Sequence, residues 1–163
     1  MKQRTTSRYG MDAIEEDFMS CGYYSRPYVY LLALLPKISQ TPIAVVSLVD
    51  FGRQWFKSIQ GLSVESTPRC LAFCSHVVKR KARDGVMVVP DATKDDRFKD
   101  NPLVTGGPKI RFYAGAALIS PEGARLGSFC VIDSEPHPDL TFKQKEMLQS
   151  FATEAVLCII SRV

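Results

Sequence analysis

Three side chains with metal-binding or nucleophilic groups lie close together in the sequence: Cys70, Cys74 and His76. Thiols and an imidazole can bind zinc, or they can form a cysteine nucleophile with its base. The same segment predicts a helix over residues 71–81, on which Cys74 and His76 point about 160° apart. These two side chains therefore cannot share one ion or one proton. Since His137 is the only other histidine, the sequence predicts no metal site.

The cysteines as a group do not form a disulfide framework, because the chain has five of them and no C-x-x-C pair. The first residues do not resemble a cleaved signal, so we expect a reducing, cytoplasmic setting. Cys74 and Cys130 have two interpretations. Each packs as a small apolar side chain, or the two form a thiol pair beside a pocket.

Hydrophobic patterns along the chain predict both helices and strands. Apolar residues at helical spacing cover residues 27–38, and Pro36 should end or kink this helix. Asp50-Phe51-Gly52 is the turn of a first hairpin. The strand-like segments cover residues 43–50, 54–59, 86–89, 111–119 and 125–133. Hairpin-linked strands with helices towards the ends of the chain indicate an α+β domain with an antiparallel sheet.

The last helix is predicted to begin at Thr141, which forms a capping-box pattern with Gln144. Its core stripe consists of Leu148, Phe151, Ala155 and Ile159. Residues 156–160 are apolar almost all the way round, which a helix on a single sheet does not need. The excess predicts a second partner, either the helix at 27–38 or the same helix of another subunit.

The charges do not indicate nucleic acid or membrane binding. The formal net charge is only +4, and the basic run Lys79-Arg80-Lys81 is typical of a solvated helix end, with no interleaved aromatic residues. The apolar run over residues 28–35 is too short to cross a bilayer.

The order of several segments resembles a GAF domain. These segments are TPIAVVSLVD, RQWFKS, FCSHVV, VVPDATKDDRFKDNPLVTGGPKIRFYAGAALIS and LGSFCVID, and the resemblance extends over residues 24–163. It implies a five- or six-stranded antiparallel sheet, with the N- and C-terminal helices on one face and a loop-covered pocket on the other. We predict a flexible arm over residues 1–22 and a single GAF-like domain over residues 23–163.

The predicted ligand site lies where the long loop meets the sheet. Arg111 and Tyr113 are two residues apart in a strand and share one face, while Phe112 and Ala114 share the other. An arginine beside aromatic rings could bind an anionic or aromatic small molecule. The predicted ligand-binding residues are Trp55, Phe73, His76, Asp91, Phe98, Arg111 and Tyr113.

A structural interpretation of the same residues stays open. In it, acidic residues hold the loop in place through Arg97 and Arg111, and Trp55 and Phe98 fill the cavity. The acidic residues are Asp91, Asp95 and Asp96.

The GAF resemblance implies a regulatory or sensory domain that binds a small molecule or a partner protein, signals through its terminal helices, dimerises through them and has no catalysis of its own. Bilin-binding members attach the pigment through a cysteine followed at once by histidine. Because Ser75 separates Cys74 from His76, we predict no cofactor. Two alternatives remain: a thiol-dependent reductase of free methionine sulfoxide, and an interaction module with a self-filled pocket.

Overall fold

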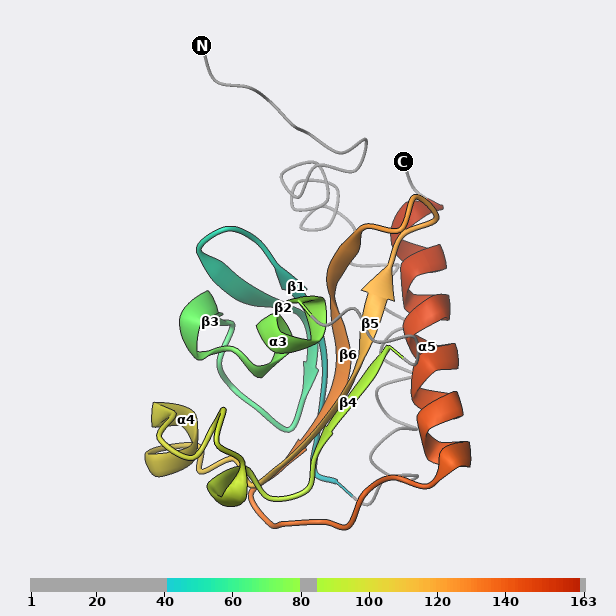
Figure 1. Ribbon diagram of the computed structural model, residues 1–163. Helices are drawn as coiled ribbons and strands as arrows, with labels where there is room; N and C mark the ends of the chain where they lie inside the picture. The colour runs from blue at the N-terminus through green and yellow to red at the C-terminus, as the bar shows by residue number, and fades with distance from the viewer. Residues whose placement is uncertain (1–40, 80–84, 162–163) are drawn as a thin grey trace.

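The centre of the molecule is a six-stranded antiparallel sheet (Figure 1). A computed structural model describes residues 41–79 and 85–161. The strands follow the order β3-β2-β1-β6-β5-β4 across the sheet. Their bounds are β1 Ile43–Val49, β2 Arg53–Gln60, β3 Ser66–Pro68, β4 Val86–Val89, β5 Phe112–Ile119 and β6 Arg125–Asp133. The prediction of an α+β domain with an antiparallel sheet is confirmed.

The predicted first hairpin is confirmed. The Asp50 carboxylate accepts hydrogen bonds from the backbone N–H groups of Gly52 and Arg53, at 2.9 and 2.8 Å, and so closes the turn between β1 and β2. The short strand β3 was not predicted. Its three residues carry no hydrophobic alternation, and only their pairing with Arg53–Trp55 on β2 makes them a strand.

A β-bulge in β2 changes the alternation that its sequence predicts. Ser58 pairs with Val46 and Phe56 pairs with Ser47, so Lys57 is the extra residue of the bulge. Phe56 therefore packs with Ile59 on one face of the sheet, while Trp55 packs on the other.

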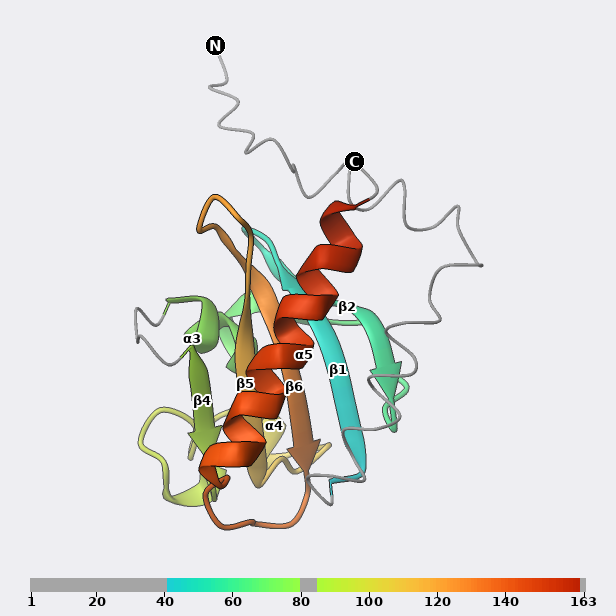
Figure 2. The ribbon, with the colours of Figure 1, turned by 90° about the vertical axis from the view of Figure 1, so that its right-hand side faces the viewer.

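The helix α5 (Phe142–Ile160) lies along one face of the sheet (Figure 2). Its predicted capping box is present, with the Thr141 hydroxyl accepting from the Gln144 N–H at 3.3 Å and the Gln144 side chain accepting from the Thr141 N–H at 2.8 Å. The predicted stripe packs against β5 and β6: Leu148, Ala155 and Ile159 are buried, and Phe151 is partly buried. Of the helices in the described ranges, none combines the length and apolarity needed to cross a membrane.

The opposite face is covered by α3 (Phe73–Lys79) and by the segment from residue 90 to residue 111 (Figure 1). Three short helices belong to this region. The helix η1 (Arg69–Leu71) precedes α3, while η2 (Ala92–Lys94) and α4 (Pro102–Thr105) lie within the segment from residue 90 to residue 111. The helix predicted from residue 71 begins at Phe73, because the extended backbone of Ala72 separates it from η1. The predicted arm at 1–22, the helix at 27–38 and Arg80-Lys81 lie outside the described residues.

Candidate functional site

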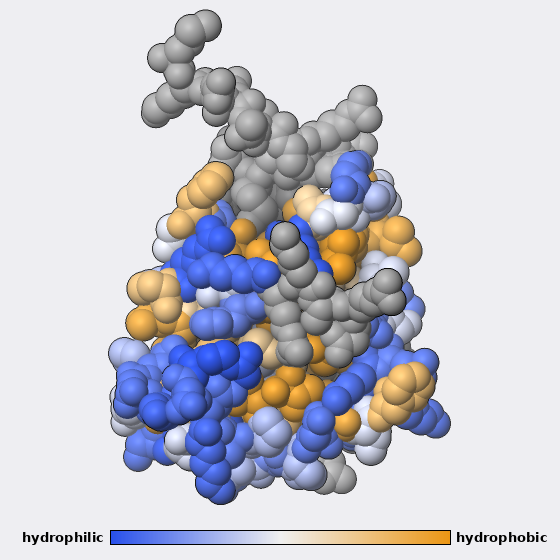
Figure 3. Space-filling model, viewed as in Figure 1, coloured by the Kyte–Doolittle hydropathy of each residue, from blue (hydrophilic) through white to orange (hydrophobic). Residues whose placement is uncertain are grey.

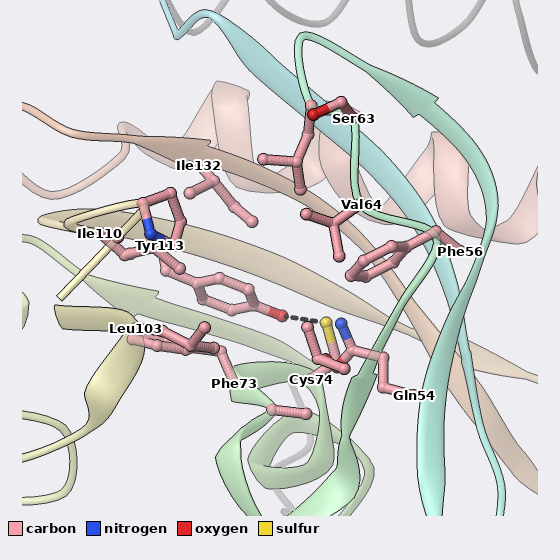
Figure 4. A pocket seen from close by; sticks show the side chains of 15 residues that line it. Gln54, Phe56, Ser63, Val64, Phe73, Cys74, Leu103, Ile110, Tyr113 and Ile132 are labelled. Atoms are coloured by element: carbon pink, nitrogen blue, oxygen red, sulfur yellow. Dashed lines mark hydrogen bonds between the residues drawn. The ribbon is translucent and has the colours of Figure 1, made fainter.

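A cavity of about 340 Å³ lies between the sheet and the elements on its α3 side (Figure 4). Three aromatic side chains line it, Phe56 from β2, Phe73 from α3 and Tyr113 from β5. Leu103 from α4 and Ile110 from the end of the long loop close one side. A loop-covered pocket is therefore present on the face opposite α5.

The wall of this cavity is largely apolar. Among the described residues that line it, none is a lysine, arginine, histidine, aspartate or glutamate, and the polar ones carry amide, hydroxyl or thiol groups. Hydrophilic side chains cover the region of α4 and the loop beside it, among other parts of this side of the molecule (Figure 3). A small molecule inside the cavity would meet aromatic and aliphatic surface and a few hydrogen-bonding groups.

Two of those hydrogen-bonding groups are buried and unpaired. Gln54 Oε1 and Thr67 Oγ1 have no hydrogen-bond partner among the described residues. Their residues face each other across β2 and β3 and both line the cavity. A buried unpaired polar atom costs on the order of 1–3 kcal/mol, so a ligand that hydrogen-bonds with this pair recovers part of that free energy.

A cluster of thiols and hydroxyls forms beside the cavity. The sulfur atoms of Cys74 on α3 and Cys130 on β6 are 3.8 Å apart. The Tyr113 hydroxyl donates to the Cys74 sulfur at 3.2 Å (Figure 4). The same hydroxyl lies 3.2 Å from the Ser128 hydroxyl. The chain of contacts ends at Ser47, whose hydroxyl is 3.3 Å from that of Ser128.

Gly115 is what allows the Tyr113 ring to reach this cluster. A Cβ atom at residue 115 would lie 2.4 Å from the Tyr113 hydroxyl oxygen and 2.9 Å from Cζ. Only a residue without a side chain therefore leaves room for the ring to lie along β5. The Tyr-Ala-Gly-Ala sequence thus positions one phenol hydroxyl over the thiols.

Contacts within the cluster shift the pKa values of its two thiols in opposite directions. Burial opposes ionisation of Cys74, but hydrogen bonds from Cys130, Ser128, Ser47 and Tyr113 outweigh it and lower the pKa of the Cys74 thiol. The hydrogen bond to Cys74 and burial together raise the pKa of Cys130. Burial and the neighbouring thiols also raise the pKa of the Tyr113 phenol, which stays a proton donor.

The structure brings two of the predicted ligand-binding residues, Phe73 and Tyr113, to the cavity wall. Phe98 and His76 lie behind Phe73. The rings of Phe98 and Phe73 stack at 4.0 Å and 8°, and the His76 ring meets Phe98 edge-on at 4.8 Å. These two residues support the wall from outside, and their contact with a ligand stays a prediction.

The other three predicted residues are placed away from the cavity wall. Trp55 packs on the α5 side of the sheet. The Asp91 carboxylate caps η2 by accepting from the Thr93 N–H at 3.1 Å, and Arg111 donates to the Val104 carbonyl at 2.9 Å. Their positions outside the cavity wall do not support the predicted ligand binding, which stays a prediction.

The interpretation that charged residues hold the long loop in place is supported in part. Asp95 pairs with Arg97 at 2.6 Å, and Asp96 pairs with Lys99 at 2.7 Å. Arg111, however, holds the loop through backbone carbonyl groups and not through a carboxylate.

Gln54, Thr67 and the thiol pair were not among the predicted ligand-binding residues. The sequence placed Gln54 beside Trp55 on a strand, so it could have been assigned to the face opposite the tryptophan. Thr67 carried no such signal because β3 has no pattern of its own.

Comparisons with known proteins agree on one family and one fold. A protein-family model described as GAF domain matches residues 20–159. A cyclic di-GMP phosphodiesterase of Pseudomonas aeruginosa is 49% identical over 122 residues, which cover 75% of this chain. The chain spans only 20% of the length of that relative.

Two solved structures illustrate the shared fold. The GAF domain of a phosphoenolpyruvate-protein phosphotransferase from Coxiella burnetii matches with a TM-score of 0.68 and 14% identity, over 93% of this chain and 90% of that one. A free methionine-R-sulfoxide reductase from Neisseria meningitidis, in complex with its substrate, matches with a TM-score of 0.65 and 15% identity, over 94% and 89%. Similarity at these identities concerns the fold alone.

Proposed function

Since the chain belongs to the GAF domain family, we propose that it is a non-catalytic regulatory domain that binds a small molecule in the cavity over β2 and β5. GAF domains occur in signalling proteins, and the Pseudomonas aeruginosa relative carries its similar segment within a much longer chain. We propose that this domain acts in the cytoplasm and alters the activity of whatever is linked or bound to it.

One observation carries the proposal: Gln54 and Thr67 both line a largely apolar cavity, and each has a buried side-chain oxygen atom with no hydrogen-bond partner among the described residues. This supports a ligand with an apolar or aromatic body and one hydrogen-bonding edge, such as an amide, a lactam or a hydroxyl group. An anion would find no cation among the described residues of the wall, and burying an unpaired charge is costly. An uncharged ligand is therefore favoured over a nucleotide phosphate.

The sheet offers a short route from the cavity to α5. Tyr113 lines the cavity, while its neighbours Phe112 and Ala114 pack on the opposite face with α5. Because successive residues of a strand point to opposite faces, a ligand that displaces Tyr113 also moves the surface on which α5 rests. We propose that the signal leaves through this helix.

Thermal unfolding with a library of uncharged metabolites tests the proposal. At 100 times its dissociation constant a ligand adds about 2.7 kcal/mol, which raises the melting temperature by roughly 5 to 10 °C for a domain of this size. Gln54→Leu should weaken binding by roughly fivefold, because one hydrogen bond is worth about 1 kcal/mol. Gln60→Leu, the same change at the exposed end of the same strand, should leave binding unchanged.

Two outcomes would contradict the proposed ligand. One is a screen without any stabilising compound. The other is a ligand whose affinity is the same for the wild type and for Gln54→Leu.

A second candidate function is the thiol-dependent reduction of free methionine sulfoxide. The observation that favours it is that Cys74 lines the cavity and has Cys130 at 3.8 Å. Cys74 would take the sulfoxide oxygen, Cys130 would displace it as water by forming a disulfide, and an added dithiol would reduce that disulfide. Turnover with dithiothreitol that Cys130→Ser abolishes would support this candidate, and a rate equal to that of buffer would reject it.

A further inference from the structure

We propose that Cys74 and Cys130 form an oxidation site, at which a small hydroperoxide in the cavity oxidises Cys74 and Cys130 then closes a disulfide between α3 and β6. This inference concerns a chemical modification of the protein itself. It depends neither on the ligand proposed above nor on any turnover of a substrate.

The positions of the two thiols give them different roles in the reaction. Cys74 lines the cavity, whereas Cys130 lies behind it at the centre of β6, between Val45 of β1 and Gly115 of β5. Both cysteines are closed to bulk solvent, with 1% and 0% of their surface exposed. A reagent small enough to enter the cavity therefore meets Cys74 first, and Cys130 is placed to react second.

The distance between the sulfur atoms suits a closing step. A disulfide bond is about 2.05 Å long, so the two sulfur atoms must approach by about 2 Å from their present 3.8 Å. Cys70 and Cys158 give a contrast within the same chain. Cys70 is exposed, Cys158 is half-buried, and neither has a hydrogen bond to another thiol among the described residues.

The chemistry needs only a hydroperoxide as oxidant. The Cys74 thiolate attacks one peroxide oxygen, the O–O bond breaks, and the other oxygen leaves with a proton as water or an alcohol. The Cys130 thiol then attacks the sulfur of the resulting sulfenic acid, the S–O bond breaks, and the oxygen leaves with the Cys130 proton as water. Two thiols lose two electrons in total, and the peroxide takes them up.

The surrounding hydroxyl groups favour this order of events. The Tyr113 hydroxyl donates to the Cys74 sulfur, which stabilises the thiolate, while Cys130 keeps its proton until the second step. Tyr113 acts as a positioning residue, since its hydroxyl group acts on the nucleophile through the hydrogen bond to the Cys74 sulfur.

Oxidation would change the cavity itself. The new bond draws α3 towards β6, and Phe73, next to Cys74, forms part of the cavity wall. The Tyr113 hydroxyl also loses its thiol acceptor. The reduced and oxidised proteins therefore present differently shaped cavities.

The test treats the purified full chain with hydrogen peroxide at neutral pH, then alkylates the remaining thiols after denaturation. We expect a mass loss of two hydrogen atoms, alkylation of three of the five cysteines instead of all five, and a linked peptide pair containing Cys74 and Cys130. Dithiothreitol should restore all five. Alkylation of Cys74 and Cys130 after treatment of the folded protein, or a disulfide through Cys70 or Cys158, would overturn the proposal.

Variants separate the two steps. Cys130→Ser should stop at a Cys74 sulfenic acid that dimedone traps, whereas Cys70→Ser should form the disulfide as the wild type does. Tyr113→Phe should slow the oxidation at neutral pH and move the midpoint of its pH–rate profile to higher pH. An unchanged profile would remove Tyr113 from the mechanism.

Discussion

Tyr113 has two hydrogen-bond contacts with the thiol cluster and one face on the cavity, so it links the two features of the candidate site. Its ring fits only because residue 115 is glycine, and its hydroxyl lies within hydrogen-bonding distance of both Cys74 and Ser128. The tyrosine was predicted to bind a ligand because of its position on a strand. Its second contact, with a thiol 39 residues earlier in the chain, has no local signal in the sequence.

His76 gives a residue-scale prediction about pH. Burial lowers the pKa of its imidazole in the folded protein, and the nearby Arg97 and Lys79 lower it further. In the unfolded chain the pKa of a histidine is about 6.5. As the pH falls below that value the unfolded chain takes up a proton that the folded protein resists, so the free energy of unfolding decreases until the lowered pKa is reached.

Urea unfolding between about pH 7.5 and 5 measures this loss. His76→Gln removes the titrating group, so the variant should lose less of its free energy of unfolding over that range than the wild type. Equal losses in the two proteins would show that His76 does not titrate differently on folding.

At the scale of elements, the segment from residue 90 to residue 111 is better organised than a mobile lid would be. Asp91 caps η2, Asn101 caps α4, and the Asn101 amide also donates to the Leu71 carbonyl at 2.9 Å. Within the segment, the side chains of Phe98 and Val104 are buried. The loop therefore forms a fixed wall of the cavity.

The apolar C-terminal end of α5 is the surface on which the predicted dimer would depend. Val156 and Ile159 pack against the sheet of their own chain, so the apolar end of α5 is partly explained without a partner. Leu157 remains 55% exposed on the outer side of that end. A dimer through this helix should therefore use Leu157, and Ile159 would be a poor probe because its replacement disrupts the core.

We expect Leu157→Glu to convert a dimer to a monomer at micromolar concentration without lowering the melting temperature. Light scattering coupled to size exclusion measures the mass. The matched control is Glu154→Gln, a change at another exposed position one turn earlier on α5. A wild-type monomer, or a dimer that survives Leu157→Glu, would contradict dimerisation through this end of the helix.

At the scale of the whole molecule, one sheet separates two cores with different contents. The face under α5 is an apolar core. The opposite face holds the cavity, the thiols, and Gln54 and Thr67, whose side-chain oxygen atoms have no hydrogen-bond partner among the described residues. The predicted GAF membership is confirmed, since the family model covers most of the chain. Because β5 and β6 contribute to both faces, the proposed sensing and the proposed signalling share the same two strands.

The sequence by itself determined the features that local patterns encode. Strands 86–89 and 125–133 have the predicted bounds, and the turn at Asp50 and the cap at Thr141 are present. Alternation, turn chemistry and capping each depend on residues within a few positions of one another, and this is why they could be recognised without a structure.

Only the tertiary structure decided which side chains meet. A bulge placed Phe56 and Ile59 on the cavity face, and Trp55 lies on the other. The strand β3 exists only through its pairing with β2, and Cys74 and Cys130 meet across 56 residues. Such contacts follow from how distant segments pair and pack, and the free energy that fixes them comes from burial of the whole core and not from any local pattern.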